Sequence, residues 1–374
     1  MEQLFAYAVE CRRYLHMHPE VGFDLPLTAA FVRQKLEELG LVPADRYGTC
    51  SLVAELGPEE GPVIALRADM DALPVEEKTG LPFSSCHPGK MHACGHDAHT
   101  AVLLAVAKHL KQQERQLTNR VRLIFQPSEE GAVSGAKMMV DNGVMEGVRY
   151  VIAAHCENRL ETGDLGVSTG NCMAACAPIT LEFFGKTSHA TAPQQGVDAI
   201  AMAWEAYGKL KETVARIAGA EPYIWSVGTF QGGTAHNVVA DHCKMDISFR
   251  FYDDDFAEKV RTAVERIGND TAKAFGGAFK LHWKISTGAV YNEPGLTALF
   301  KQRMAEIGVP VADMPPRMSS EDFGWYLTKA PGMLLRFGTG TKGNGSAHQN
   351  DFRIDEDGMA YAIRAFTTMV LQGL

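Results

Sequence analysis

The segment Met91–His99 (MHACGHDAH) concentrates side chains that bind metals: three histidines, Cys94 and Asp97. Neutral imidazole, thiolate and carboxylate are the groups that bind divalent transition metals, and packing alone does not require so many of them together. Cys94 and His96 lie two residues apart in what we expect to be an irregular loop, so both can turn toward one ion. His92 and His99 offer further ligands. The segment therefore indicates a metalloenzyme.

Asp97 is expected to serve such a site without binding the ion. At its position the carboxylate can accept a ring N–H from a ligand histidine and so fix the tautomer of that histidine. The competing interpretation of the whole segment is the start of a helix, with Asp97 near the N-cap and the histidines on the surface.

A pair of glutamates, Glu129 and Glu130 (QPSEEG), follows the apolar segment Val121–Gln126, which is typical of a strand. Adjacent residues after a strand end point in different directions, so one carboxylate can bind a metal while its neighbour holds a water. Metal-assisted hydrolysis needs this division, because a bound ion lowers the pKa of water and a second carboxylate removes the proton. An isolated pair of glutamates is more often a solvated surface, but its position after a strand favours function.

The first half of the chain alternates between helical and strand-like patterns. This alternation predicts an α/β fold, with a mainly parallel sheet covered by helices. The expected helices are Leu4–Leu15, Thr28–Leu39, His99–Lys111 and Gly135–Asn142, and the expected strands are Ser51–Glu55, Val63–Arg67, Val121–Gln126 and Tyr150–His155.

Polar side chains recur where these strands end. Asp69 and Asp71 follow one strand, the glutamate pair follows another, and His155 ends a third. In open α/β sheets, sites form beyond the carboxyl ends of the strands. A lone histidine at a strand end is more often a core or rim residue, but this recurrence favours His155 as a ligand.

From Ile179 the pattern changes to the order β-α-β-β-α-β, which is typical of a ferredoxin-like sandwich. We therefore expect a smaller α+β domain, residues 178–288, inserted into a catalytic domain made of residues 1–177 and 289–374. The expected strands are Ile179–Phe184, Ile224–Gln231, Cys243–Phe251 and Phe279–Ser286, and the expected helices are Asp198–Ile217 and Asp255–Ala274.

Three polar residues of the insertion could contact a substrate. His189 (GKTSHATAP) and Asn237 (TAHNVVAD) lie in turns, where a neutral donor could stabilise an oxyanion during acyl transfer. Ordinary turn chemistry on a surface loop explains both residues equally simply. Arg250 lies in an apolar strand and needs an anionic partner, which is either a structural carboxylate or a substrate carboxylate held by two hydrogen bonds.

Composition excludes several classes of protein. The 374 residues are 46% hydrophobic and 22% charged, which is ordinary for a soluble globular protein. No apolar run approaches the roughly 18 residues of a membrane span, and the first residues lack the pattern of a secretory signal. A net charge of −9 without a basic stripe argues against nucleic acid. Eight cysteines are too dilute for a disulfide scaffold, so we expect reduced thiols and a cytoplasmic protein.

Taken in order, these segments resemble the two-metal amidohydrolases and metallopeptidases of clan MH, which include aminoacylases and carboxypeptidase G. Within that group the chain is similar to bacterial N-acyl-amino-acid hydrolases, hippurate hydrolase and plant auxin-conjugate hydrolases. The resemblance covers nearly the whole chain. It includes RRYLHMHPEVGFD, ALRADMDALPVEE, MHACGHDAHTA, FQPSEEG, His155, GKTSHATAP, TAHNVVAD, SSEDFGWYL and His348.

The resemblance implies two divalent ions per chain and a general base, Glu129, that activates the attacking water. Because one implied ligand is a thiolate, zinc, manganese, cobalt or nickel is favoured over magnesium or calcium. His348 by itself would pass for an exposed loop histidine. The implied metal ligands are Cys94, His96, Glu130, His155 and His348.

The resemblance also implies roles beside the metal site. His189 and Asn237 would be substrate or oxyanion contacts of a lid domain, and Arg250 would hold the substrate carboxylate. Asp69 and Asp71 would line the metal site behind its ligands. The oligomeric state stays open, although the lid domain could offer an edge strand or a helix face for a homodimer or homotetramer.

The resulting expectation is hydrolysis of the amide bond of N-acyl amino acids. The alternative within enzymes is a dipeptidase or carboxypeptidase that uses the same two metals. A metal-dependent scaffold that has lost catalysis would show a broken ligand set, and a nucleotide-binding protein would show a phosphate loop; the sequence has neither feature. Two departures from relatives affect the expected pocket: Gln349-Asn350 after the late histidine, and the glycine-rich stretch 338–345 before it.

Overall fold

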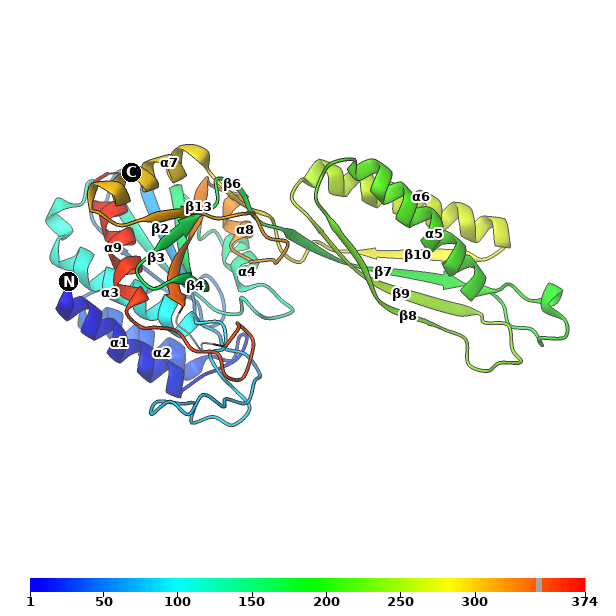
Figure 1. The fold of residues 1–374 in the computed structure, drawn as a ribbon, viewed down its shortest axis with the longest axis horizontal. Coiled ribbons are helices and arrows are strands. Elements are labelled where there is room, and N and C mark those ends of the chain that lie inside the picture. Colours follow the sequence, from blue (N-terminus) through cyan, green and yellow to red (C-terminus); the bar gives the residue numbers. More distant parts are fainter. Residues whose placement is uncertain (341–344, 374) are drawn as a thin grey trace. The chain divides into compact units, whose positions relative to one another are not determined.

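A computed structural model describes residues 1–340 and 345–373, and the chain divides into two compact units (Figure 1). The larger unit comprises Met1–Cys172, Val290–Pro316 and the residues from Asp322 onward. The second unit comprises Met173–Ala289 together with a short returning segment, Arg317–Glu321, which lies outside the insertion expected from the sequence.

The described residues of the larger unit build a seven-stranded sheet whose central strands are parallel. Strand β2 is buried along its whole length, as expected of a strand with helices on both faces. The predicted α/β fold with a mainly parallel sheet is confirmed. In spatial order the strands are β1 (Leu52–Leu56), β3 (Arg120–Gln126), β2 (Val63–Asp69), β4 (Val148–Glu161), β13 (Gly332–Gly340), β5 (Leu165–Val167) and β12 (Val311–Asp313).

Helices and short elements complete the larger unit. They are α1 (Glu2–Met17), α2 (Pro26–Glu38), α3 (His96–Gln112), α4 (Gly135–Asp141), α7 (Pro294–Glu306), α8 (Gly324–Leu327), α9 (Gly358–Leu371), the 3-10 turn Glu114–Gln116, and the paired strands β6 (Gly170–Met173) and β11 (Val290–Asn292).

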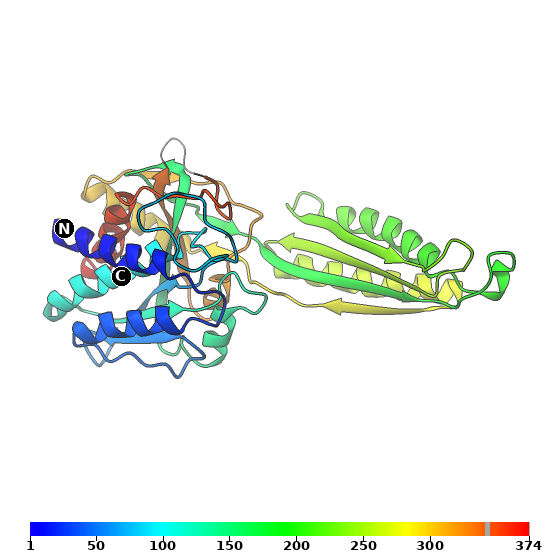
Figure 2. The same cartoon turned by 90° about the horizontal axis from the view of Figure 1, so that it is seen from below.

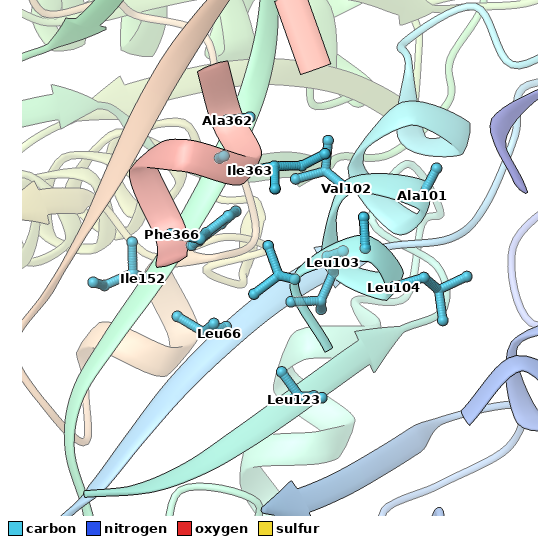
Figure 3. Close-up of a cluster of buried hydrophobic side chains, with 14 of the residues drawn as sticks. Leu66, Ala101, Val102, Leu103, Leu104, Leu123, Ile152, Ala362, Ile363 and Phe366 are labelled. Carbon is cyan, nitrogen blue, oxygen red and sulfur yellow. The ribbon is translucent and has the colours of Figure 1, made fainter. Parts of the chain in front are cut away.

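One part of the core of this unit lies between the sheet and the helices α3 and α9. Figure 3 shows side chains of α3 and α9 facing Leu66, Leu123 and Ile152 of three neighbouring strands. Residues Ala98–Ala107 of α3 are all buried, so this helix is enclosed on every side. The first turn of α3 therefore has a rigid support, which matters because it carries candidate ligands.

The second unit has the expected β-α-β-β-α-β order, with an antiparallel sheet in the order β10-β7-β9-β8. Helices α5 and α6 lie side by side along one face of this sheet (Figures 1 and 2). Its elements are β7 (Ala175–Phe184), the 3-10 turn Pro193–Gln195, α5 (Ala199–Ala218), β8 (Ile224–Gly232), β9 (His242–Phe251), α6 (Asp254–Phe275) and β10 (Ala278–Trp283).

The strand end that moves furthest from the sequence-based expectation is the end of β4. His155 does not end its strand, because β4 continues to Glu161. The extension exists because β13 stays paired with β4 past His155, whereas the pairing of β2 with β4 ends at Arg67 and Ala153. His155 therefore still lies beyond the last paired residues of β2, at the edge where the candidate site is expected.

Across the residues described, no helix combines the length and the apolar character needed to cross a membrane.

Candidate metal centre

The five implied metal ligands come together in the larger unit as two groups of three. The ligand atoms of Cys94, His96 and His155 all lie within 4.8 Å of one another, and so do those of Cys94, Glu130 and His348. Cys94 belongs to both groups. The two groups together could hold two divalent ions.

The local backbone explains how Cys94 and His96 reach the same point. Helix α3 begins at His96, so this histidine lies in a helical first turn and not in the irregular loop expected from the sequence. Gly95 between them has φ +84, and a Cβ there would lie 2.4 Å from the Cys156 sulfur. Only glycine tolerates this close approach and this backbone conformation.

The hydrogen bonds of two histidines prepare them for metal binding. His96 Nδ1 lies 2.8 Å from the Asp71 carbonyl oxygen, and His155 Nδ1 lies 2.7 Å from the Cys156 carbonyl oxygen. Because a carbonyl only accepts, each Nδ1 must carry the hydrogen, which leaves the lone pair of the neutral ring on Nε2. His96 Nε2 is buried without a hydrogen-bond partner among the described residues. His155 Nε2 lies 3.6 Å from Sγ of Cys94, another implied ligand. Both nitrogens are therefore placed to bind a metal ion.

His99 is different, although it lies beside these ligands. Its Nδ1 donates to Asp69 Oδ1 at 2.6 Å, and its Nε2 accepts from the backbone N–H of Cys156 at 2.9 Å. Both ring nitrogens are therefore in use, so His99 has no lone pair for a metal. Its role is to hold Asp69 and the chain next to His155.

Asp97 does not orient a ligand histidine, which corrects the expectation from the sequence. Its Oδ2 accepts from His16 Nδ1 at 2.7 Å and from Arg12 Nε at 3.1 Å, both on α1. Asp97 thus ties α1 to the start of α3. Burial lowers the pKa of His92, in the same segment, to about 3, so this histidine stays neutral.

Asp71 fixes the backbone of the glutamate pair. Its Oδ1 accepts from the N–H of Glu129 at 2.9 Å, and its Oδ2 accepts from the N–H of Glu130 at 3.1 Å. The two side chains contact different partners: Glu130 Oε1 lies 3.0 Å from His348 Nε2, and Glu129 Oε2 lies 3.9 Å from His96 Nε2. Ligand atoms of both glutamates and of His96 all lie within 4.8 Å of one another. This geometry allows the expected roles, in which Glu130 binds a metal ion and Glu129 holds the water.

The late histidine is held by its backbone. His348 has φ +68 and donates its N–H to the Ala93 carbonyl at 2.8 Å, which fastens it to the segment of Cys94. The carbonyl of Asn350 accepts from the N–H of Lys78 at 2.7 Å. The His348 side chain remains 52% exposed. Within the glycine-rich stretch that precedes it, residues 341–344 lie outside the described residues.

Electrostatics at the centre favour a cation. Burial raises the pKa of the Cys94 thiol well above its ordinary value. Burial opposes a charge on His96, but Asp69 and Cys94 raise the pKa of this imidazole well above its usual range. Burial likewise opposes the charge on Glu130, but His348 and His96 lower its pKa. A proton on His96 thus takes the place of the positive charge that an ion would supply.

The predicted substrate contacts lie in the second unit. The Ala190 N–H donates to the Asn237 carbonyl at 2.9 Å, so the turns of His189 and Asn237 are neighbours. Thr191 contacts His189 Nδ1 twice: its N–H donates at 3.3 Å, and its Oγ1 lies at 2.8 Å.

Arg250 is held within the same unit by neutral acceptors. Its Nη1 donates to the Met318 carbonyl at 3.1 Å and to Ser320 Oγ at 2.8 Å. Both acceptors belong to the returning segment Arg317–Glu321.

Sequence reasoning missed a buried polar network behind the centre, formed by Arg67, Gln126 and Asp322. Arg67 Nη1 donates to Asp69 Oδ2 at 2.7 Å and its Nη2 donates to Asp322 Oδ1 at 2.9 Å. The signal was present, because Arg67 is a charged residue inside an otherwise apolar strand pattern, and such a residue requires an anionic partner when buried.

With this geometry in place, comparisons with known proteins become informative. A family model described as peptidase family M20/M25/M40 matches residues 65–372. An N-acetyl-L-cysteine deacetylase of Bacillus subtilis is 36% identical, over 92% of this chain and 83% of its own length. An N-acyl-L-amino acid amidohydrolase of Geobacillus stearothermophilus is 38% identical, over 75% of this chain and 76% of its own.

Two further similarities concern peptidases. A thermostable carboxypeptidase of Saccharolobus solfataricus is 32% identical, over 96% of this chain and 93% of its own. The crystal structure of a Bacillus subtilis protein, described as a dinuclear metal binding peptidase from the M20 family, superposes with a TM-score of 0.87 at 31% identity. That match covers 100% of this chain and 99% of the other.

The tautomer assignment predicts which histidines hold metal. His155→Ala should lose at least half of the bound metal, whereas His99→Gln should retain it. His155 Nε2 lies 3.6 Å from the implied ligand Cys94 Sγ, whereas His99 Nε2 already accepts from the backbone N–H of Cys156. Elemental analysis after metal loading and desalting gives the metal content, and circular dichroism verifies folding. Equal metal loss in two folded variants would show that the assignment is wrong.

Metal binding should also depend on pH. Since the pKa values of Cys94 and His96 are raised, the metal-free chain holds both protons at neutral pH, and an ion must displace them. Affinity should therefore increase as pH rises from 6 to 8, by up to about tenfold per pH unit for each proton released. Metal titration with simultaneous measurement of released protons tests this expectation; constant affinity without proton release would contradict it.

Proposed function

The chain belongs to peptidase family M20/M25/M40, and from that membership we propose that it is a two-metal amidohydrolase that releases amino acids from N-acyl amino acids. The observation that carries the proposal is the pair of three-residue ligand groups that share Cys94 beside the glutamate pair. The relatives named for deacetylation and for N-acyl-amino-acid hydrolysis support the substrate class.

Cys94, His96, Glu130, His155 and His348 would hold the two ions. Bound divalent ions would supply Lewis acidity that polarises the amide carbonyl and lowers the pKa of water. The relative described as dinuclear supports the number of ions. The thiolate ligand favours zinc, manganese, cobalt or nickel.

Glu129 would act as the general base. Its backbone is held by Asp71, and its Oε2 lies 3.9 Å from Nε2 of the ligand His96. From there it would take a proton from the attacking water and pass it to the leaving amine. His189 Nε2–H and the Asn237 amide are the donors we assign to the oxyanion that develops on the former carbonyl oxygen.

Arg250 is the residue we assign to the substrate carboxylate. Its present partners are a carbonyl and a hydroxyl, so an incoming carboxylate would offer a stronger, charge-assisted hydrogen bond. Gln349 and Asn350 follow the ligand His348 and are exposed, and we assign them to the wall that selects the acyl group.

The alternative activity is that of a dipeptidase or carboxypeptidase. It uses the same base and ligands, and the carboxypeptidase relative supports it. It differs in requiring recognition of a peptide in place of an acyl group.

We also propose a cytoplasmic location, because a ligand role for Cys94 requires a reduced thiol and the cytosol maintains that state.

For assembly we propose a homodimer through the second unit, which could pair further into a tetramer. Strand β8 is an edge strand of its sheet. Three large apolar side chains are exposed on β8 and α5: Ile200 at 41%, Trp204 at 70% and Phe230 at 39%. An unpaired strand edge beside exposed apolar side chains is suited to a two-fold contact with a second copy.

Activity should depend on Glu129 and on metal, and should favour acyl conjugates. Glu129→Gln should lower kcat about 10²- to 10⁴-fold with its metal retained, because the amide cannot accept the proton. The matched control Glu60→Gln, on an exposed loop, should keep wild-type activity.

The assay compares N-acetyl, N-benzoyl and longer N-acyl amino acids with dipeptides, using chelated protein before and after each metal is restored. Preference for dipeptides would select the alternative activity. Full turnover by Glu129→Gln would remove this residue from the base role.

Disrupting the apolar surface should yield monomers. Trp204→Glu places a charge in the proposed interface, so sedimentation velocity should give a monomer where the wild type gives a dimer or tetramer. Lys259→Glu, on the exposed side of α6, is the matched control and should leave assembly unchanged. A wild-type chain that sediments as a monomer would refute the assembly.

A further inference from the structure

Asp322 is a buried carboxylate at the centre of the polar network behind the metal centre. Its side chain is 1% exposed. It accepts from Arg67 Nη2 at 2.9 Å, and Gln126 Nε2 lies 2.9 Å from both of its oxygens. An ionised carboxylate is costly to bury unless charged and hydrogen-bonding partners compensate. The presence of those partners shows that this position is built for a charged group.

The same carboxylate holds the exit of the turn that carries Glu129 and Glu130. Asp322 Oδ2 accepts from Ser134 Oγ at 2.7 Å and from the N–H of Ala136 at 3.1 Å. Ser134 is also the N-cap of α4, where its Oγ accepts from the N–H of Lys137 at 3.0 Å. Asp322 therefore fixes the point at which the turn becomes a helix.

The two ends of the turn, near Ser128 and Gly135, contact each other. A contact that fixes the second end therefore also restricts the first. Gly135 donates its N–H to the Ser128 carbonyl at 2.9 Å. A Cβ on Gly135 would lie 1.7 Å from the Pro127 carbonyl oxygen, so the two ends of the turn are in contact. Ser128 has φ +52, a conformation that side-chain-bearing residues rarely adopt. Such a turn keeps its shape only while its surroundings hold it.

Asp322 also contacts the glutamate pair directly. Its backbone N–H donates to Glu129 Oε1, over 3.4 Å. Asp71 holds the N–H groups of both glutamates from the other side. Asp71 thus holds the Glu129 backbone, while the backbone N–H of Asp322 contacts the Glu129 carboxylate.

We propose that Asp322 is a positioning residue for the Glu129–Glu130 turn, and that it sets the place of the Glu129 carboxylate during hydrolysis without touching the substrate. The inference rests on the proposed role of Glu129 as the base. Since a displacement of about 1 Å in a reacting group can cost roughly 100-fold in rate, turnover should respond to Asp322 more strongly than substrate binding does.

The test is Asp322→Asn in the full-length protein. An amide has one accepting oxygen, and its NH2 group cannot accept from Ser134, Ala136 or Arg67. We expect kcat to fall about 10- to 100-fold, KM to change less than about threefold, and metal content to stay at the wild-type value. In metal-free protein, amide hydrogen exchange of residues 129–137 should accelerate.

Asn292→Ala is the matched control for a general loss of stability. Asn292 is buried in the same unit and makes three hydrogen bonds, to the Ser168 carbonyl and to both backbone groups of Leu334. This control should lower the unfolding temperature, yet leave both kcat and the exchange of residues 129–137 at wild-type values.

Three results would overturn the positioning role: a wild-type kcat in Asp322→Asn, a loss of kcat that follows a loss of metal, or the same loss of kcat in Asn292→Ala.

If Asp322→Asn does not fold, Ser134→Ala removes one donor to Asp322. It should lower kcat severalfold and accelerate exchange at residues 134–137, and a wild-type kcat there would refute the proposal. An active Glu129→Gln would instead point to an error in the base assignment.

Discussion

The candidate centre depends on how one residue, Asp71, distributes its three oxygen atoms. The carbonyl oxygen sets the tautomer of His96, and the two carboxylate oxygens hold the N–H groups of Glu129 and Glu130. Asp71, just after β2, thereby holds a ligand of α3 and the two glutamates of the turn after β3 in fixed positions. Parallel strands make this possible, because their carboxyl ends meet at one edge of the sheet.

The same edge of the sheet concentrates negative charge. Some of its carboxylates are paired with cationic side chains, and others are left to bind a metal ion. Arg67 forms ion pairs with Asp69 and Asp322 behind the centre, and Asp69 in turn accepts a hydrogen bond from His99. In front of these, Cys94, Glu130 and the lone-pair nitrogens of His96 and His155 are left for a cation. The separation between permanently paired carboxylates and available ligands follows from burial, since a buried charge needs a fixed partner.

Much of the fold could be predicted because strand and helix patterns are local. The alternation in the first half of the chain and the β-α-β-β-α-β order of the insertion both appear in the structure, with boundaries shifted by a few residues. The errors have long-range causes. Strand β4 runs past His155 because β13 pairs with it from almost two hundred residues away, and Asp97 turns to His16 and Arg12 because α1 packs on α3. Neither contact leaves a local signal.

The sequence by itself determined the kinds of side chain available for metal chemistry and the strand ends and turns on which they lie, because residue type and hydrophobic periodicity are written locally. It also pointed to the family through the order of its motifs. Only the tertiary structure separated the histidines, since the tautomer of each ring depends on which carbonyl or N–H group another segment brings to it. For the same reason it alone revealed Asp322: a carboxylate becomes a support for Glu129 only when β2, β3 and the start of α4 enclose it.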